Sequence, residues 1–291
     1  MRHWILLAFL VTGSASAAAQ QVPDTAFHPP MPKPAFLPQS GPVVLLDEAH
    51  FNFHTSTGRY LPFAELLRRD GYVVTPSTKL FSDDVLRGAS VLVVSNALNE
   101  RNQNDWRPPN PPAFTPIEVE AVRDWVSAGG ALLLFADHAP FAGAAEVMGR
   151  AFGIRFLDGA VNRKGGSGPI VFRKSDGTLI DHPITKGIDE VATFTGSSFQ
   201  MDTLGQPLLV LGPETYSFTS QNDPRPVLVS GRLQGAVLPF GKGKVAVFGE
   251  AAMFSAQLAG PNKMPMGMNA PTARQNPQFL LNVVHWLTGV S

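Results

Sequence analysis

The sequence contains no cysteine among its 291 residues. This absence excludes disulfide bonds, thiolate catalysis and cysteine-ligated metal sites. It also excludes a lipid anchor attached through a cysteine. With 44% hydrophobic residues, a chain of this length can fill the core of one large domain or two small ones without disulfide bonds.

The chain also lacks a charge excess and a membrane-spanning run. Lys and Arg total 23, Asp and Glu total 23, and the basic residues form no run. Nucleic-acid binding needs clustered positive charge that neutralises phosphates, so we expect no nucleic-acid partner. The apolar run at residues 4–11 is well short of the roughly 20 residues that span a bilayer. We therefore expect no integral membrane segment in the mature chain.

The N-terminus has the three parts of a secretory signal peptide. Arg2 and His3 precede the apolar run, and small residues follow it as far as Ala19. We expect cleavage near Ala17 or Ala19, so that residues 1–19 are removed and the protein is exported to the periplasm or the medium. Residues 20–41 are rich in proline, which fixes φ and lacks an amide proton, and they are predicted to form an extended tether.

Apolar runs of strand length alternate with segments of helical period from residue 42 onward. The predicted strands are residues 43–46, 72–74, 90–95, 131–136 and 244–249, and the predicted helices are residues 60–69, 116–128, 144–152 and 277–287. This order predicts a three-layer, flavodoxin-like α/β fold with a mostly parallel sheet and helices on both faces, over residues 42–288. Residues 158–240, with short apolar runs among Gly, Ser, Thr and Pro, predict an insertion of antiparallel β strands or an extension of the sheet edge.

Polar side chains follow most of the predicted parallel strands. Ligands of open parallel sheets bind beyond the carboxyl ends of the strands. The candidate catalytic residues are Asp47, His50, Asp137, His138 and Glu250, and the candidate substrate-binding residues are Glu48, Asn52, His54 and Asn96. Carboxylates beside histidines can perform general acid–base catalysis. Asp47, His50 and His138 can also hold a divalent metal such as zinc, with one position left for water.

Each of these residues also has a structural explanation. Asp47 and Asp137 can accept backbone N–H groups of the loop or helix that follows. His138, which precedes Ala-Pro, can be a turn residue. Methionine alternates with other residues at 264–268, and thioethers suit Cu(I), but the pattern favours a mobile loop whose methionines cover a pocket.

Several stretches of the chain match a known pattern. They are VLLDEAH at residues 44–50, RRDGY at 68–72, WVSAGGALLL at 125–134, DHPITKGI at 181–188 and GKGKVAVFGE at 241–250. Together they resemble the class I glutamine amidotransferase-like superfamily, in its exported branches of trehalose-utilisation-like and gliding-motility-type domains. The resemblance covers roughly residues 42–288. It implies a cysteine at a strand-to-helix elbow, but here the elbow carries Asp137 and His138, which excludes glutamine hydrolysis by that route.

The sequence therefore predicts an exported amidotransferase-like domain and candidate hydrolase. Its expected ligand is a small molecule, carbohydrate or peptide-like, bound at the crevice of Asp, His and Glu side chains with or without a metal. The alternative is a non-catalytic module of the cell envelope that binds a ligand or partner. In that case the same side chains serve as helix caps and turn residues. The fold does not decide between the two alternatives, because one fold can carry many functions.

Overall fold

The computed structural model describes residues 21–31, 33–166, 168–202, 205–219 and 225–290 of the chain. The predicted signal peptide lies outside these residues. None of the helices in the described ranges combines the length and the apolar character that a membrane crossing requires.

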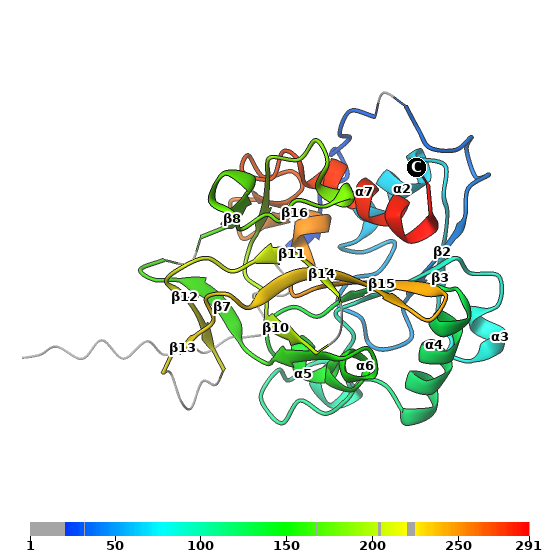
Figure 1. Cartoon of the computed structure of the whole chain (residues 1–291), viewed down its shortest axis with the longest axis horizontal. Coiled ribbons are helices and arrows are strands. Elements are labelled where there is room, and N and C mark those ends of the chain that lie inside the picture. Colours follow the sequence, from blue (N-terminus) through cyan, green and yellow to red (C-terminus); the bar gives the residue numbers. More distant parts are fainter. Residues whose placement is uncertain (1–20, 32, 167, 203–204, 220–224, 291) are drawn as a thin grey trace, which may run out of the picture.

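A nine-stranded sheet organises the fold (Figure 1). Its parallel strands are β2 (Val43–Asp47), β3 (Val73–Ser77), β4 (Val91–Ser95), β5 (Ala131–Phe135) and β15 (Gly243–Phe248). They are adjacent in the order β3-β2-β4-β5-β15, which is the flavodoxin-like order. The predicted fold class is confirmed. The strand order reverses between β2 and β4, and the crevice at such a reversal is where ligands bind in this architecture.

Helices cover both faces of this sheet, as predicted (Figure 1). One face carries α2 (Leu61–Arg69) and α7 (Asn276–Thr288), and the other carries α3 (Asp83–Leu86), α4 (Pro116–Ala128), α5 (Phe141–Ala144) and α6 (Glu146–Ala151). Alternate strand residues feed two cores, so that Leu46 packs in the core with α2 and α7, whereas Leu45 packs in the core with α4 and α6. The helix predicted at residues 144–152 is present as α6, and the separate short helix α5 precedes it.

The start of α4 is a capping box, as its sequence predicts. The Thr115 hydroxyl accepts the N–H of Glu118, and Glu118 Oε2 accepts the N–H of Thr115 at 3.0 Å. The helix ends at Gly129, whose φ of 129° is a conformation that glycine adopts without penalty. These signals place α4 correctly along the chain, and Glu118 has a second role described below.

The segment at residues 158–240 contains antiparallel strands, as predicted. Two small sheets are formed by β7 (Ala160–Arg163), β12 (Thr215–Phe218) and β13 (Val227–Leu228), and by β8 (Ile170–Arg173) and β9 (Glu190–Thr193). The main sheet is extended beyond β15 by β14 (Leu233–Phe240), β10 (Ser198–Met201), β11 (Gln206–Val210) and β6 (Ile154–Leu157). Short 3₁₀ turns occur at η1 (Glu100–Asn102), η2 (Lys174–Asp176), η3 (Pro183–Thr185) and η4 (Ala252–Phe254).

The proline-rich N-terminal segment is bound to the folded body. Its first residues form β1 (Gln21–Pro23), which pairs with β16 (Ala256–Ala259), and β16 pairs in turn with β17 (Met264–Gly267). Phe27, Met31 and Phe36 pack against the core that contains α2 and α7. The described part of this segment therefore lies over the domain as a strap. Its apolar side chains pack against the core, which its proline content does not predict.

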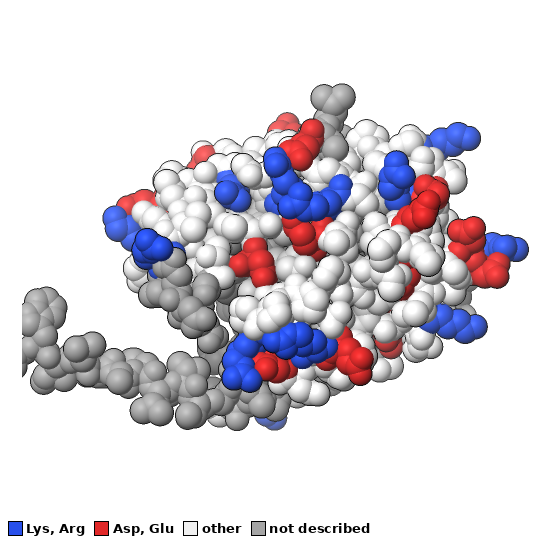
Figure 2. All heavy atoms as spheres, turned by 90° about the horizontal axis from the view of Figure 1, so that it is seen from below, with Lys and Arg blue, Asp and Glu red and all other residues white. Residues whose placement is uncertain are grey.

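Charges of both signs are mixed on the surface. On the face shown in Figure 2, Lys and Arg side chains are interspersed with Asp and Glu side chains. Exposed ion pairs such as Lys164–Glu214, at 2.8 Å, account for part of this mixing. The absence of a nucleic-acid partner stays a prediction.

Candidate functional site

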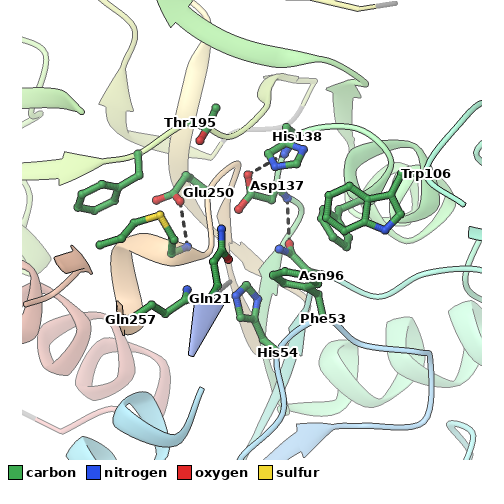
Figure 3. Close-up of a pocket in the computed structure, with 14 residues that line it drawn as sticks. Gln21, Phe53, His54, Asn96, Trp106, Asp137, His138, Thr195, Glu250 and Gln257 are labelled. Atoms are coloured by element: carbon green, nitrogen blue, oxygen red, sulfur yellow. Dashed lines mark hydrogen bonds between the residues drawn. The ribbon is translucent and has the colours of Figure 1, made fainter. Parts of the chain in front are cut away.

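The carboxyl ends of the central parallel strands open on a cavity of about 290 Å³ (Figure 3). Its polar lining consists of Gln21, His54, Asn96, Asp137, His138, Thr195, Glu250 and Gln257, and its apolar lining of Phe53, Trp106, Phe141, Phe194, Ala252 and Met266. The volume lies at the lower end of the range for small-molecule sites. Among the residues predicted from the sequence, the structure brings together His54, Asn96, Asp137, His138 and Glu250.

Asp137 and Glu250 lie side by side in this cavity (Figure 3). Glu250 follows β15 and is 1% exposed, and Asp137 follows β5 and is 6% exposed. Burial raises the pKa of Glu250 well above its ordinary value, and the negative charge of Asp137 raises it further. A carboxyl group whose pKa is raised in this way keeps its proton more readily, as a general acid must.

Backbone N–H groups fix the position of the Glu250 side chain. Its two oxygens accept the N–H of Ala252 at 2.9 Å and the N–H of Met253 at 2.8 Å. Both donors belong to η4, so Glu250 also caps this turn. Asp137 is held in a similar way, since Oδ1 accepts the N–H of His138 at 2.8 Å. The two carboxyl groups are thus positioned before any ligand arrives.

His54 is a buried, neutral histidine in the wall of the cavity. Burial lowers its pKa well below the ordinary value, and the positive charge of Arg59 lowers it further. Nδ1 lies 3.1 Å from Ser95 Oγ, and the ring stacks on Tyr60 with 4.4 Å between centroids. Nε2 is buried and has no hydrogen-bond partner within the described part of the chain.

Gln257, on β16, is a second buried side chain with unused polar atoms. It is 1% exposed, and neither its amide oxygen nor its amide nitrogen has a partner among the residues that the structure describes. A buried polar group without a hydrogen bond costs about 1–3 kcal/mol. His54 Nε2 and these two atoms are thus buried polar atoms of lining residues that have no hydrogen-bond partner in the described ranges.

Asn96 supports the site from the end of β4. Its φ is 49°, in the left-handed region that asparagine tolerates better than most residues. Its side-chain oxygen accepts the N–H of Asp137 at 3.1 Å. This bond ties the turn after β4 to the turn after β5, which carries the carboxylate.

Three aromatic rings form one wall of the cavity. Ring centroids are 5.6 Å apart for Phe53 and Trp106, 5.2 Å for Trp106 and Phe141, and 5.5 Å for Phe53 and Phe141. The His138 ring lies at the edge of this group, 6.0 Å from Trp106. Trp106 is half-buried in the proline-rich loop before α4. The wall offers apolar faces opposite the polar groups.

Sequence reasoning assigned no role to Gln21, Trp106 or Gln257. Gln21 lies in the segment predicted to be a tether, and Trp106 lies in a loop without periodicity. For Trp106, the one signal in the sequence is that a lone tryptophan lies in such a loop. Met266, in contrast, lines the cavity in agreement with the prediction that methionines cover a pocket, but its segment is the strand β17 and not a loop.

Asp47 and His50 are not among the residues that line this cavity, so the structure does not bring them together with Asp137, His138 and Glu250 there. His50 Nδ1 is 2.9 Å from both oxygens of Asp47, and Nε2 is 2.7 Å from Glu118 Oε1. Burial lowers the pKa of His50, but bonds and charges of the two carboxylates outweigh it and raise the pKa above 6.5. Both ring nitrogens of His50 are hydrogen-bonded within this network. The described residues contain no group of three acidic or histidine side chains that could hold one.

Glu48 and Asn52 line a neighbouring, more open cavity of about 520 Å³. It adjoins the first cavity at Phe53 and Trp106, which line both. Asn52 Nδ2 donates to Asp47 Oδ2 at 2.9 Å, so this amide supports the buried ion network. The structure thus separates these two predicted substrate-binding residues from the carboxyl pair.

Comparisons with known proteins inform on the fold. No protein-family model and no curated protein matches the chain. Among solved structures, the mmIFT52 N-terminal domain aligns with a TM-score of 0.62 and 14% identity, over 84% of this chain and 97% of that chain. Cytoplasmic Protein STM1381 from Salmonella typhimurium LT2 aligns with a TM-score of 0.52 and 14% identity, over 84% and 98%. A thua-like protein from Bacteroides uniformis ATCC 8492 aligns with a TM-score of 0.48 and 16% identity, over 89% and 93%. At these identities the alignments with the mmIFT52 N-terminal domain and STM1381 show a shared fold alone.

Proposed function

We propose that this chain binds a small molecule, carbohydrate or peptide-like, in the cavity and hydrolyses it by general acid–base catalysis. The observation that carries the proposal is that Glu250 and Asp137 are both buried and line the same cavity, where burial and the charge of Asp137 raise the pKa of Glu250. Glu250 donates its proton to the leaving group as the scissile bond breaks. Asp137 accepts a proton from the attacking water, and the proton then returns to Glu250 to complete the cycle.

The remaining lining supports a ligand of this class. The rings of Phe53, Trp106 and Phe141 can pack against apolar faces of a sugar or a side chain. The amides of Asn96 and Gln257 can pair with hydroxyl or peptide groups. Apolar walls with a few fixed polar groups are typical of sites for small molecules.

The proposal places the reaction outside the cytoplasm. Its basis is the signal-peptide pattern of residues 1–19 and the resemblance to exported amidotransferase-like domains. The substrate is then a compound of the periplasm or the medium. The thiol chemistry of the amidotransferases is not part of the proposal, since the chain has no cysteine.

A panel of chromogenic glycosides, esters and peptide amides tests the reaction. Glu250→Gln and Asp137→Asn should each lower turnover by about 10²–10⁴-fold, the contribution typical of a general acid or base. Glu120→Gln, which changes an exposed carboxylate in the same way, should leave turnover unchanged. Wild-type turnover in either of the first two variants would overturn the proposal.

A non-catalytic ligand-binding module is the second candidate. The hydrogen bonds that Glu250 accepts from two backbone N–H groups favour this candidate. Capping these N–H groups is a structural role that explains the carboxyl group without catalysis. A protein that binds panel compounds but cleaves none of them would establish this candidate in place of the hydrolase.

A further inference from the structure

Phe51, in the loop after β2, combines a strained backbone with an exposed side chain. Its φ is 47°, in the left-handed region that a bulky residue rarely adopts. Its side chain is 41% exposed, although an aromatic ring gains much free energy from burial. Phe51 lines the second, open cavity of about 520 Å³. Backbone strain of this kind is concentrated at active sites and ligand clamps.

Hydrogen bonds on both sides hold Phe51 in this conformation. The His50 carbonyl accepts the N–H of Leu98 at 2.8 Å. The Phe53 N–H donates to the Asn96 carbonyl at 3.0 Å. Both neighbours of Phe51 in this loop are thus attached to the segment after β4, and the His50 ring is itself held between two buried carboxylates. The surrounding structure therefore imposes the strained conformation, as its persistence requires.

The second cavity shares a wall with the cavity that contains the carboxyl groups. Phe53 and Trp106 line both cavities. The Arg59 guanidinium lies 3.8 Å from the centroid of the Phe53 ring, and Nη1 donates to the Phe53 carbonyl at 3.2 Å. Arg59 therefore holds the Phe53 ring in place. A ligand that extends from the first cavity past this wall enters the second cavity, which Phe51 lines.

The size and the charges of the two cavities restrict such a ligand. At about 290 Å³, the first cavity is at the lower end of the range for small-molecule sites, so a longer ligand must continue outside it. The charged side chains among the described lining residues of the second cavity are Glu48 and Arg59, one of each sign. The exposed amides of Gln103 and Asn104 offer both donors and acceptors. This lining suits an uncharged unit with an apolar face and a polar edge.

We propose that the ligand is an uncharged, linear molecule of at least two units, with one unit beside Asp137 and Glu250 and the next packed on Phe51 in the second cavity. The inference rests on the proposed function for the position of the first unit. Phe51 is then a specificity-determining residue that selects longer ligands over single units. Oligosaccharides and peptides share the required chemistry, and the two arms of the test distinguish them.

Calorimetric titration of two neutral series tests the length of the ligand. One series contains glucose, mannose and N-acetylglucosamine with their dimers and trimers, and the other contains blocked alanine peptides of one to three residues. Glu250→Gln protein is titrated beside the wild type, so that cleavage does not consume the ligand. We expect that in one series the dimer binds about tenfold more tightly than the single unit.

Substitution of Phe51 tests the position of the second unit. Phe51→Ala should weaken dimer binding by about 3–10-fold and leave the affinity for the single unit unchanged, because only the second unit contacts this ring. Phe218→Ala is the matched control, since Phe218 is 42% exposed on β12 and is not among the residues that line either cavity. It should leave both affinities unchanged.

Urea denaturation separates this role of Phe51 from a structural one. Phe51→Asn introduces a residue that tolerates the left-handed region better, so the denaturation midpoint should stay the same or rise. A lower midpoint would assign the Phe51 ring to the stability of the fold and overturn the inference.

Three binding results would also overturn it: no binding in either series, equal affinity for single units and dimers, or equal weakening of both by Phe51→Ala. None of these readouts needs turnover, so failure of the inference can be told apart from failure of the proposed reaction. A protein that selects dimers through Phe51 and cleaves nothing keeps this inference and loses hydrolysis. A protein that cleaves panel compounds but binds single units and dimers equally does the reverse.

Discussion

His50 Nε2 lies 2.7 Å from Glu118 Oε1, and this bond joins the loop after β2 to the first turn of α4. Nδ1 of the same ring is 2.9 Å from Asp47, so one histidine is held between two carboxylates. The Glu118 carboxylate also accepts the N–H groups of Thr115 at 3.0 Å and Phe81 at 3.1 Å. The buried network therefore connects three segments of the chain.

Removing His50 should destabilise the fold. His50→Ala leaves two carboxylates buried without their shared partner, and breaking a buried ion pair in this way costs about 3–5 kcal/mol. Urea denaturation measures the loss in the free energy of unfolding. His28→Ala, at an exposed position of the strap, should change this free energy by less than about 0.5 kcal/mol. Equal effects of the two substitutions would contradict the role of the network.

The contribution of the network should depend on pH in a defined window. The pKa of His50 is raised above 6.5, so its contribution is fully present below pH 6.5 and is lost as pH rises through the raised pKa. The pKa of Glu118 is lowered below 4.5, because its hydrogen bonds outweigh burial, so its contribution is present above pH 4.5 and is lost as pH falls.

The difference in unfolding free energy between wild type and His50→Gln should therefore be largest between about pH 4.5 and about pH 6.5. Other groups, such as Glu250, titrate in both proteins, so their contributions to the unfolding free energy cancel in this difference. A difference that instead rises as pH approaches 6.5 and stays at its maximum above that pH would show that His50 is neutral in the folded state.

The strap should contribute to stability through Phe36. This ring packs edge-on against Tyr72 with 5.2 Å between centroids and is half-buried, whereas its neighbour Leu37 is 77% exposed. Phe36→Ala should cost about 2 kcal/mol, less than the 3–5 kcal/mol of a fully buried phenylalanine. Leu37→Ala is the matched control, and thermal or urea unfolding compares the two. If the two variants were equally stable, the segment would behave as the tether that its proline content predicts.

The parallel strands β2, β4, β5 and β15 could be predicted because they are buried on both faces and therefore read as nearly continuous apolar runs. Asp137 and Glu250 could be located for a related reason, since they directly follow β5 and β15. The partner of His50 could not, because Glu118 is 68 residues away and has a complete local explanation as a helix cap. Gln21 and Trp106 lie in segments without hydrophobic periodicity, and tertiary packing brings them to the cavity. No local sequence pattern therefore predicts that they line it.

The aromatic wall should contribute to ligand binding more than to folding. Trp106 is half-buried in a loop and contacts Phe53 and Phe141 only at ring edges. Trp106→Ala should weaken binding of a panel ligand by about tenfold, while the free energy of unfolding falls by no more than about 1 kcal/mol. Calorimetric titration and urea denaturation of the same preparation separate the two effects. A large loss of stability without loss of affinity would assign Trp106 to the core instead.

The charge of Asp137 should set part of the proton affinity of Glu250. Asp137→Asn removes that charge but keeps the burial, which is the larger cause, so the pKa of Glu250 should fall and yet stay above its ordinary value. Infrared difference spectroscopy follows the C=O band of the protonated carboxyl, and Glu250→Gln identifies the band by its loss. We expect the band to disappear at lower pH in Asp137→Asn than in wild type or in the Glu120→Gln control. Hydrolysis by the wild type should decline over the same pH range as its own band, because Glu250 must hold its proton to act as the acid. An unchanged titration in Asp137→Asn would mean that the two carboxyl groups do not act as a pair.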